Sequence, residues 1–284
     1  MAAFGVDTGL YTDLYNAVLN ANRRWLDFFP NMGSPSAGTT NSRITTAVSL
    51  QTPADGTMLA NNAARTSVAL TAFDGAHTIS LLAYELDQFT RDPGALPAEV
   101  KAFANASVLA AEEIVIADLV AGTGGNEETL PVGQVDFATD GTVTERHTTL
   151  SALDVSIAFI RAATQSKPQD LFILMPSVCY GNFLTLINAT ADATASITQY
   201  GEPVPTYRGI PVFVTAVTTN FGAAAKDAAY VVHKDAETIN WQPFEMQPGF
   251  HKADDGLWKL IMSTYGHAGL IQASHYATVI NPAS

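Results

Sequence analysis

The sequence has few charged side chains, and those it has are unbalanced. Only 14% of the 284 residues are Asp, Glu, Lys or Arg, against about 25% in an average soluble domain. The 27 acidic and 14 basic residues give a formal net charge of -13. No run of Lys or Arg occurs, and a negative surface repels nucleic acid and anionic membranes. The composition disfavours a nucleic-acid-binding function, and the low charge indicates that other chains cover much of the surface.

Cysteine, metal-binding patterns and catalytic motifs are also scarce. Cys179 is the only cysteine, which excludes an internal disulfide and a metal site with several cysteine ligands. It lies at a predicted helix start, so it is either a nucleophile or a buried structural residue. The six histidines are scattered without a metal-binding spacing, and no Gly-x-Ser-x-Gly elbow occurs. We therefore expect no enzyme activity, no catalytic or metal site and no cofactor.

Long hydrophobic runs are missing too. No apolar run approaches 18 residues without a charge, so we expect no membrane span and no membrane partner. The first residues, MAAFGVDTGLY, lack the basic and apolar regions of a signal peptide. We therefore expect a protein that is made in a cytosol.

The element around which the rest is organised is a predicted helix over residues 97–121. Pro97 suits a first helical turn, and Gly122 can take the left-handed cap. At 1.5 Å per residue this helix would be ~37 Å long. One face carries apolar or small residues at helical spacing, namely Val100, Ala104, Val108, Ala111, Val115 and Leu119. Such a rod needs packing partners on several sides, although an ordinary buried helix of an α/β enzyme is an alternative.

Segments next to this helix in the sequence lack obvious support within the chain. Residues 12–29 predict a helix, and a turn-rich linker follows it, so we expect this arm to dock on another surface. Residues 43–73 predict a long hairpin with a turn at TPADGT. Because an isolated two-stranded ribbon is marginal in water, either a partner surface supports it or its strands belong to an ordinary sheet. A short helix is expected over residues 79–89.

From residue 148 onward, helices alternate with buried strands. Thr149 caps a predicted helix, and LFILM at 171–175 is a continuous apolar run, as in a strand buried on both faces. Further strands are expected at 207–215 and 228–234, followed by ribbons up to the C-terminal YGHAGLIQASHYATVI. This order predicts an α+β fold with segregated elements rather than a repeating βαβ series.

The order and spacing of these pieces resemble the major capsid protein of tailed bacteriophages, the Hong Kong 97-type fold. The resemblance covers nearly the whole chain. It is carried by TISLLAYEL before the long helix, by GTGG after it, by the LFILMP strand with a following helix, and by Gly-Ile-Pro-Val at 209–212. None of these motifs is a catalytic signature.

The resemblance implies a division of the chain into capsid regions. The N-terminal arm would be residues 1–42, and the extended loop would be 43–76. The peripheral domain would comprise 77–145 and 236–265, with spine helix 97–121. The axial domain would comprise 146–235 and 266–284. Each part is an expectation that follows from the family and not from composition or periodicity.

The function implied is that of a major capsid protein. Such a protein self-assembles into pentamers and hexamers of an icosahedral phage head that encloses double-stranded DNA, built in the bacterial host cytoplasm. A separate scaffolding protein, a portal and a decoration protein are the further partners expected. The alternatives are the shell of an encapsulin-like compartment, which encloses protein cargo, and, from a different class, an α+β enzyme or ligand-binding protein.

The resemblance also implies contacts between subunits. The candidates are Trp25 on the arm and Arg43, Asp55 and Arg65 on the extended loop. Some family members crosslink neighbouring subunits through a lysine on this loop. Here the first lysine of the chain is Lys101, so the loop has no amine nucleophile and we expect no such crosslink.

Overall fold

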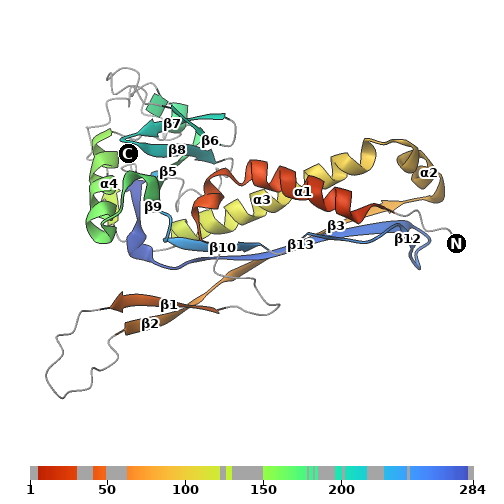
Figure 1. Cartoon of the computed structure of the whole chain (residues 1–284), viewed down its shortest axis with the longest axis horizontal. Helices are drawn as coiled ribbons and strands as arrows, with labels where there is room; N and C mark the ends of the chain where they lie inside the picture. The colour runs from red at the N-terminus through yellow and green to blue at the C-terminus, as the bar shows by residue number, and fades with distance from the viewer. Residues whose placement is uncertain are drawn as a thin grey trace, which may run out of the picture.

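The helix α3 (Ala95–Ala121) forms the spine of one half of the molecule (Figure 1). It contains many alanines and begins two residues before Pro97, which therefore falls in the first turn. All six residues of its predicted apolar face are buried. The computed structural model describes residues 6–30, 41–48, 63–121, 126–129, 150–177, 179–181, 183–184, 196–199, 202–215, 227–241 and 244–280.

Shorter helices accompany α3. They are α1 (Thr8–Asn22), η1 (Arg24–Phe28), α2 (Ala83–Arg91), α4 (Leu150–Thr164), η2 (Pro168–Asp170) and η3 (Ala273–His275). The Asp7 side chain caps α1 by accepting the Leu10 N–H at 3.2 Å. Glu85 caps α2 by accepting the Leu82 N–H at 2.8 Å. Helix α1 lies beside α3, and α2 lies at the far tip (Figure 1).

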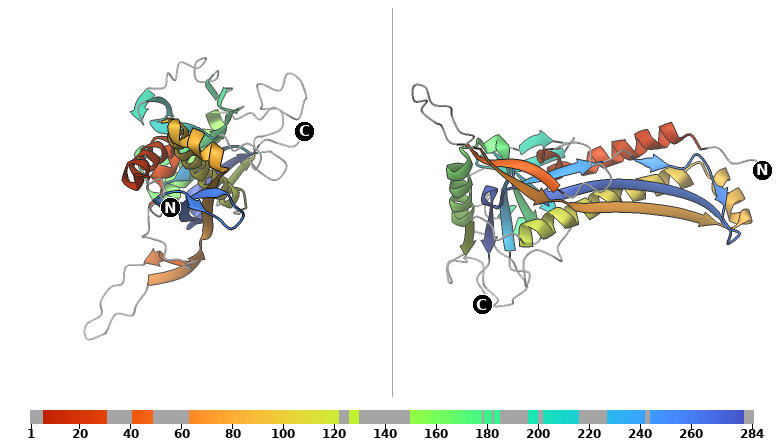
Figure 2. Two further views of the ribbon diagram at one scale, coloured as in Figure 1. Left: turned by 90° about the vertical axis from the view of Figure 1, so that its right-hand side faces the viewer. Right: turned by 90° about the horizontal axis from the view of Figure 1, so that it is seen from below.

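A long antiparallel sheet underlies α3 and completes what we call the elongated half (Figure 2). Its strands are β3 (Thr71–Leu81), β10 (Glu237–Trp241), β11 (Glu245–Met246), β12 (His251–Lys252) and β13 (Trp258–Leu270). Every other strand pairs with β13. Along β13, Leu260 and Met262 are buried while Ile261 is 37% exposed, which is the two-residue period of a sheet with one covered face.

A mixed sheet and α4 form what we call the compact half. The sheet order is β4-β14-β9-β5-β8-β7-β6. The bounds are β4 (Asn126–Thr129), β5 (Leu171–Pro176), β6 (Ser196–Gln199), β7 (Glu202–Tyr207), β8 (Ile210–Thr215), β9 (Asp227–His233) and β14 (Tyr276–Ile280). Strand β5 pairs in parallel with β8 and antiparallel with β9, so it has a neighbour on each side.

The two cores of the molecule lie on opposite faces of β5. Leu171, Ile173 and Met175 belong to the core under α4. Phe172 and Leu174 belong to the larger core, which continues along α3 into the elongated half. Because successive strand residues point to opposite faces, a strand buried on both faces must be apolar throughout, and this confirms the prediction for residues 171–175.

Several expected boundaries need correction. The helix expected at 79–89 is split, because β3 runs on to Leu81 and α2 begins only at Ala83. The return strand of the hairpin ends at Ala69, and residues 71–76 belong to β3, which pairs with β13. In each case, cross-strand pairing with a segment distant in sequence extends the strand beyond the local pattern.

Candidate assembly surfaces

A two-stranded ribbon projects away from both halves (Figures 1 and 2). It consists of β1 (Asn41–Val48) and β2 (Ala63–Ala69), paired antiparallel from Asn41↔Ala69 to Val48↔Ala63 with an irregularity between Thr45 and Ala47. Within the described residues, these two strands form a sheet of their own. Counting the described residues alone, each strand therefore has one edge with unpaired backbone groups, which is a template for pairing with another surface.

Two of the predicted contact residues lie on this ribbon. Arg43 is in register with Ser67, and Arg65 is in register with Thr45, so the two arginines are two register positions apart. The structure therefore brings them together on the projecting element. Asp55 lies outside the described residues.

Trp25 is not at a surface. Its side chain is 0% exposed and lies between Phe29 and Phe172, with ring centroids 6.2 Å and 6.0 Å away. The segment that follows α1 therefore packs on the chain's own β5, and its carbonyl at Pro30 accepts the Thr238 hydroxyl at 2.7 Å. The expectation that this arm docks elsewhere is wrong for residues 6–30, which pack on their own chain. In this structure Trp25 has no exposed surface for contact with a neighbour.

A buried carboxylate faces the same segment. Glu112 on α3 is 8% exposed, and its Oε2 accepts the Thr215 hydroxyl at 3.3 Å. Burial raises the pKa of Glu112 to about 7, while Thr215, the Trp25 indole and the Arg24 charge act in the opposite direction. Glu112 thus joins the spine helix to the end of β8 and to the arm. The sequence pattern missed this role, because Glu112 looks like one of several exposed helix acids.

The turn between β7 and β8 forms a second polar cluster, against α4. Arg208 and Gly209 are its two central residues, with φ of 53° and 78°. Asp154 on α4 accepts Arg208 Nε at 3.2 Å and Nη2 at 3.0 Å. It also accepts the Tyr207 hydroxyl at 2.9 Å, and burial together with this carboxylate raises the pKa of Tyr207 to about 12. The Gly-Ile-Pro-Val motif therefore begins in a tight hairpin turn, for which glycine is suited.

Apolar side chains are exposed at separate places on the surface. They are Leu10 on α1, Leu82 and Tyr84 at the α2 tip, Leu109 on α3, Val155 on α4 and Ile261 on β13. Single exposed apolar residues are normal, so none of them defines an interface by itself. Their spread over both halves is compatible with contacts on several sides of the molecule.

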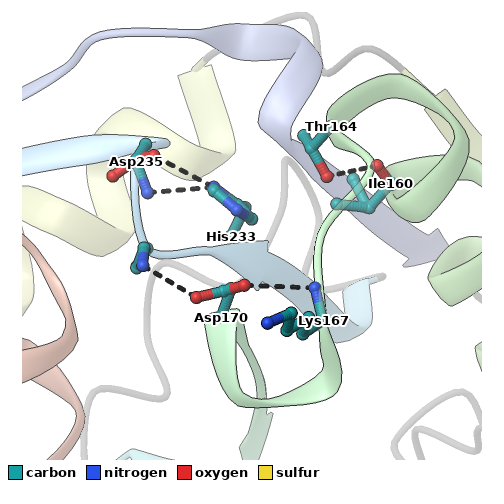
Figure 3. A network of polar contacts seen from close by, with 7 residues as sticks. Ile160, Thr164, Lys167, Asp170, His233 and Asp235 are labelled. Carbon is teal, nitrogen blue, oxygen red and sulfur yellow. Dashed lines mark hydrogen bonds and ion pairs between the residues drawn. The ribbon is translucent and has the colours of Figure 1, made fainter.

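A polar network joins η2 to the end of β9 and to the turn that follows it (Figure 3). Asp170 accepts the Lys167 N–H at 3.1 Å and Lys234 Nζ at 2.7 Å. His233 Nδ1 accepts the Asp235 N–H at 3.1 Å, so its ring proton is on Nε2. Burial lowers the pKa of His233 and outweighs the opposing pull of Asp235, whose carboxylate is 3.8 Å away. The network therefore contains a neutral histidine rather than a second ion pair.

Among the described residues, no group of three or more His, Cys, Asp or Glu side chains is placed to hold a metal ion. Cys179 is buried, as the structural interpretation expects. No helix among the described residues is both long and apolar enough to cross a bilayer.

Comparisons by sequence and by structure give different results. No protein-family model matches the chain, and no curated protein matches it. The fold does match solved structures. The capsid of cyanophage P-SCSP1u has a TM-score of 0.57 at 13% identity, covering 92% of this chain and 88% of that one. The virus-like particle of Pyrococcus furiosus has a TM-score of 0.58 at 11% identity, covering 96% and 100%.

An encapsulin matches as well. The SrpI encapsulin of Synechococcus elongatus has a TM-score of 0.51 at 10% identity, covering 90% of this chain and 86% of that one. Together these likenesses confirm that the chain has the α+β Hong Kong 97-type fold. At these identities they establish the fold, while function has to be argued from the chain's own features.

Proposed function

We propose that this chain is the structural subunit of a self-assembling icosahedral shell, and specifically the major capsid protein of a tailed-phage head that encloses double-stranded DNA. Its subunits would form pentamers and hexamers. The role is architectural and requires no catalysis. The fold supports a shell-forming role, because phage capsids, an archaeal virus-like particle and an encapsulin have similar structures.

The observation that carries the proposal is the projecting ribbon β1–β2. Its strands pair only with each other within the described residues. A two-stranded ribbon is marginal in water without a covering surface. A neighbouring copy supplies such a surface in a shell, and a monomer does not. The low charge content of 14% is in keeping with a subunit that buries much of its surface.

The division into capsid regions is part of the proposal. The arm 1–42, the extended loop 43–76, the peripheral domain 77–145 with 236–265, and the axial domain 146–235 with 266–284 follow the family pattern. In this scheme, α3 and most of the long sheet around β13 belong to the peripheral domain. Scaffolding, portal and decoration proteins are the further partners proposed.

The first test is the particle mass of the purified protein, by light scattering after size exclusion with negative-stain images of each peak. Rings or megadalton shells are expected. A stable monomer near the chain mass of 30.1 kDa at all concentrations would reject the shell proposal. A protease-resistant ribbon in that monomer would place its support within the chain.

The contents of the particles distinguish a phage head from an encapsulin-like compartment. Nuclease-protected double-stranded DNA in particles from the native source is expected for the phage head. A co-purifying cargo protein without DNA would favour the compartment, for which the encapsulin likeness is the specific observation. The acidic composition, net -13, suits an inner surface that does not bind packaged DNA.

Mature particles should also lack covalent links between subunits. Residues 43–76 contain no lysine, so the loop offers no amine for an isopeptide bond. A boiled denaturing gel of mature particles should give a single band near the chain mass. A ladder of higher bands would contradict this expectation.

A further inference from the structure

The two halves meet where the chain crosses twice between their sheets. The first crossing leads from β9 to β10 through residues 234–236, and the second leads from β13 to β14 through residues 271–275. The crossings are bonded together, because Ala236 O accepts the Ile271 N–H at 2.7 Å and the Gln272 N–H at 3.0 Å. We call residues 233–237 together with 270–276 the joint.

A fully buried acid lies at the joint. Glu237 is the first residue of β10, is 0% exposed, and is in register with Leu270, the last residue of β13. Neither carboxyl oxygen of Glu237 has a hydrogen-bond partner among the described residues. The negative charge of Asp118, in the last turn of α3, disfavours a second negative charge on Glu237. Asp118 in turn accepts the Leu270 N–H.

This placement is unfavourable for a second negative charge. The C-terminal end of α3 carries the negative end of the helix dipole. A buried carboxylate without a partner keeps its proton in preference to ionising. Accordingly, burial first and Asp118 second raise the pKa of Glu237 well above 4.5, and burial raises the pKa of Asp118 to about 6.

The joint also contains two histidines. His233 and His275 meet edge to face with ring centroids 5.3 Å apart. Burial is the main cause that lowers both pKa values. Lys234 pairs with Asp170 at 2.7 Å, and Asp235 lies beside His233, so these charges are on the histidine side and the structure shows no contact from them to Glu237.

We propose that the joint is a proton-dependent hinge, which is rigid while Glu237 is neutral and loosens when Glu237 ionises beside Asp118. The direction follows from linkage: a carboxyl that holds its proton more tightly when folded makes the fold less stable as pH rises. Alkaline pH therefore frees the elongated half to move relative to the compact half. The inference concerns the single subunit and does not depend on shell formation.

The test is amide hydrogen exchange of the unassembled full-length chain from pH 4.5 to pH 8.5, corrected for the intrinsic pH dependence of exchange. Protection of residues 237–241 and 266–271 should fall with pH in the wild type. In Glu237→Gln, which keeps the shape of the neutral acid, these amides should exchange at least about tenfold more slowly than wild type at pH 8.5. At pH 4.5, where the open form also begins to hold the proton, the two proteins should be similar.

The matched control is Glu245→Gln, which removes the same charge from an exposed position of the same sheet. It should leave the pH dependence at the joint unchanged. Asp118→Asn, which retains an acceptor for the Leu270 N–H, should make the loss of protection with pH smaller, because the Asp118 charge is one of the two causes that raise the pKa of Glu237. If wild-type protection is independent of pH, or if Glu245→Gln acts like Glu237→Gln, the hinge is excluded. If Glu237→Gln fails to fold, the wild-type series and Asp118→Asn decide.

Discussion

The N-terminal segment and the projecting ribbon are the two regions expected from the sequence to depend on neighbouring chains, and they differ sharply. The N-terminal segment buries Tyr15, Trp25 and Phe29 in the core of its own chain. The ribbon β1–β2 forms a separate sheet and projects away from that core. Weak local support in a sequence therefore does not distinguish a segment that folds back from one that reaches out. Here the large apolar side chains of the N-terminal segment are what hold it against the core of its own chain.

Trp25→Ala should have the largest effect on the isolated subunit. Removing a fully buried aromatic side chain that packs on Phe172 should lower the free energy of unfolding by about 3–5 kcal/mol. The measurement is urea unfolding of the unassembled subunit. Leu10→Ala, at a 60% exposed site on α1, is the control and should change stability by less than about 0.5 kcal/mol. Equal small losses in both variants would mean that the arm is not held by its own chain.

Glu112→Gln tests whether the attachment of the arm depends on pH. The pKa of Glu112 is about 7 in the folded state and 4.5 in the unfolded state. Between pH 4.5 and pH 7 the folded state therefore binds more protons than the unfolded state does. Wild-type stability should therefore fall as pH rises through this window, and the variant should lose this part of the slope. Above pH 7 the variant should be more stable by about 3 kcal/mol. Urea unfolding at pH 5 and pH 8 measures this, and the same slope in both proteins would contradict it.

Gly209→Ala perturbs an internal hairpin, β7–β8, which is the counterpart of the projecting one. With φ of 78°, Gly209 holds a left-handed conformation that costs an alanine about 1–2 kcal/mol. The free energy of unfolding should fall by that amount. Gly181→Ala, where an added Cβ meets nothing within 4 Å, is the control and should not destabilise the subunit. If Gly181→Ala lowers the free energy of unfolding and Gly209→Ala does not, the turn assignment is refuted.

Deleting the ribbon should barely change the isolated subunit. Asn41 pairs with Ala69, so a short Gly-Ser linker can replace residues 42–68. The unfolding free energy should stay within about 0.5 kcal/mol of wild type, because the ribbon shares no sheet with the rest of the described chain. Assembly, followed by light scattering, should be lost. Shells that form normally without the ribbon would remove the main support for the proposed function.

Arg43→Ala with Arg65→Ala should have the smallest effect on stability. Both positions lie on the ribbon, so we expect no measurable change in unfolding but a higher concentration needed for assembly. Arg91→Ala, which removes a charge from an exposed pair with Asp87 on α2, is the control. If the control raises that concentration as much as the double variant does, net charge rather than the ribbon is responsible.

The elements predicted best from the sequence are those whose residues carry their own signal. The apolar face of α3 and the unbroken apolar strand β5 were both predicted correctly, because burial on one helical face or on two strand faces leaves a direct pattern. The helix expected at 79–89 was partly wrong, because pairing of β3 with β13 prevailed over local helical propensity as far as Leu81.

The buried acids Glu112 and Glu237 were not recognised from the sequence. Nothing local distinguishes Glu112 and Glu237 from the exposed Glu113 and Glu245. Their burial arises because α3, β8 and β10 are far apart in the chain and meet only after folding. An unusual pKa depends on that surrounding, which sequence spacing does not encode.

By itself, the sequence determined the spine helix, the buried strand, the order of pieces that identifies the fold, and the absence of lysine from residues 43–76. These are properties of residue type and local period. Only the tertiary structure decided that Trp25 lies inside, that the ribbon lies outside, and that Glu237 faces Asp118 at the joint. The physical reason is that burial and charge interactions depend on contacts between distant segments, whereas helical and strand periods are set by neighbours in the chain.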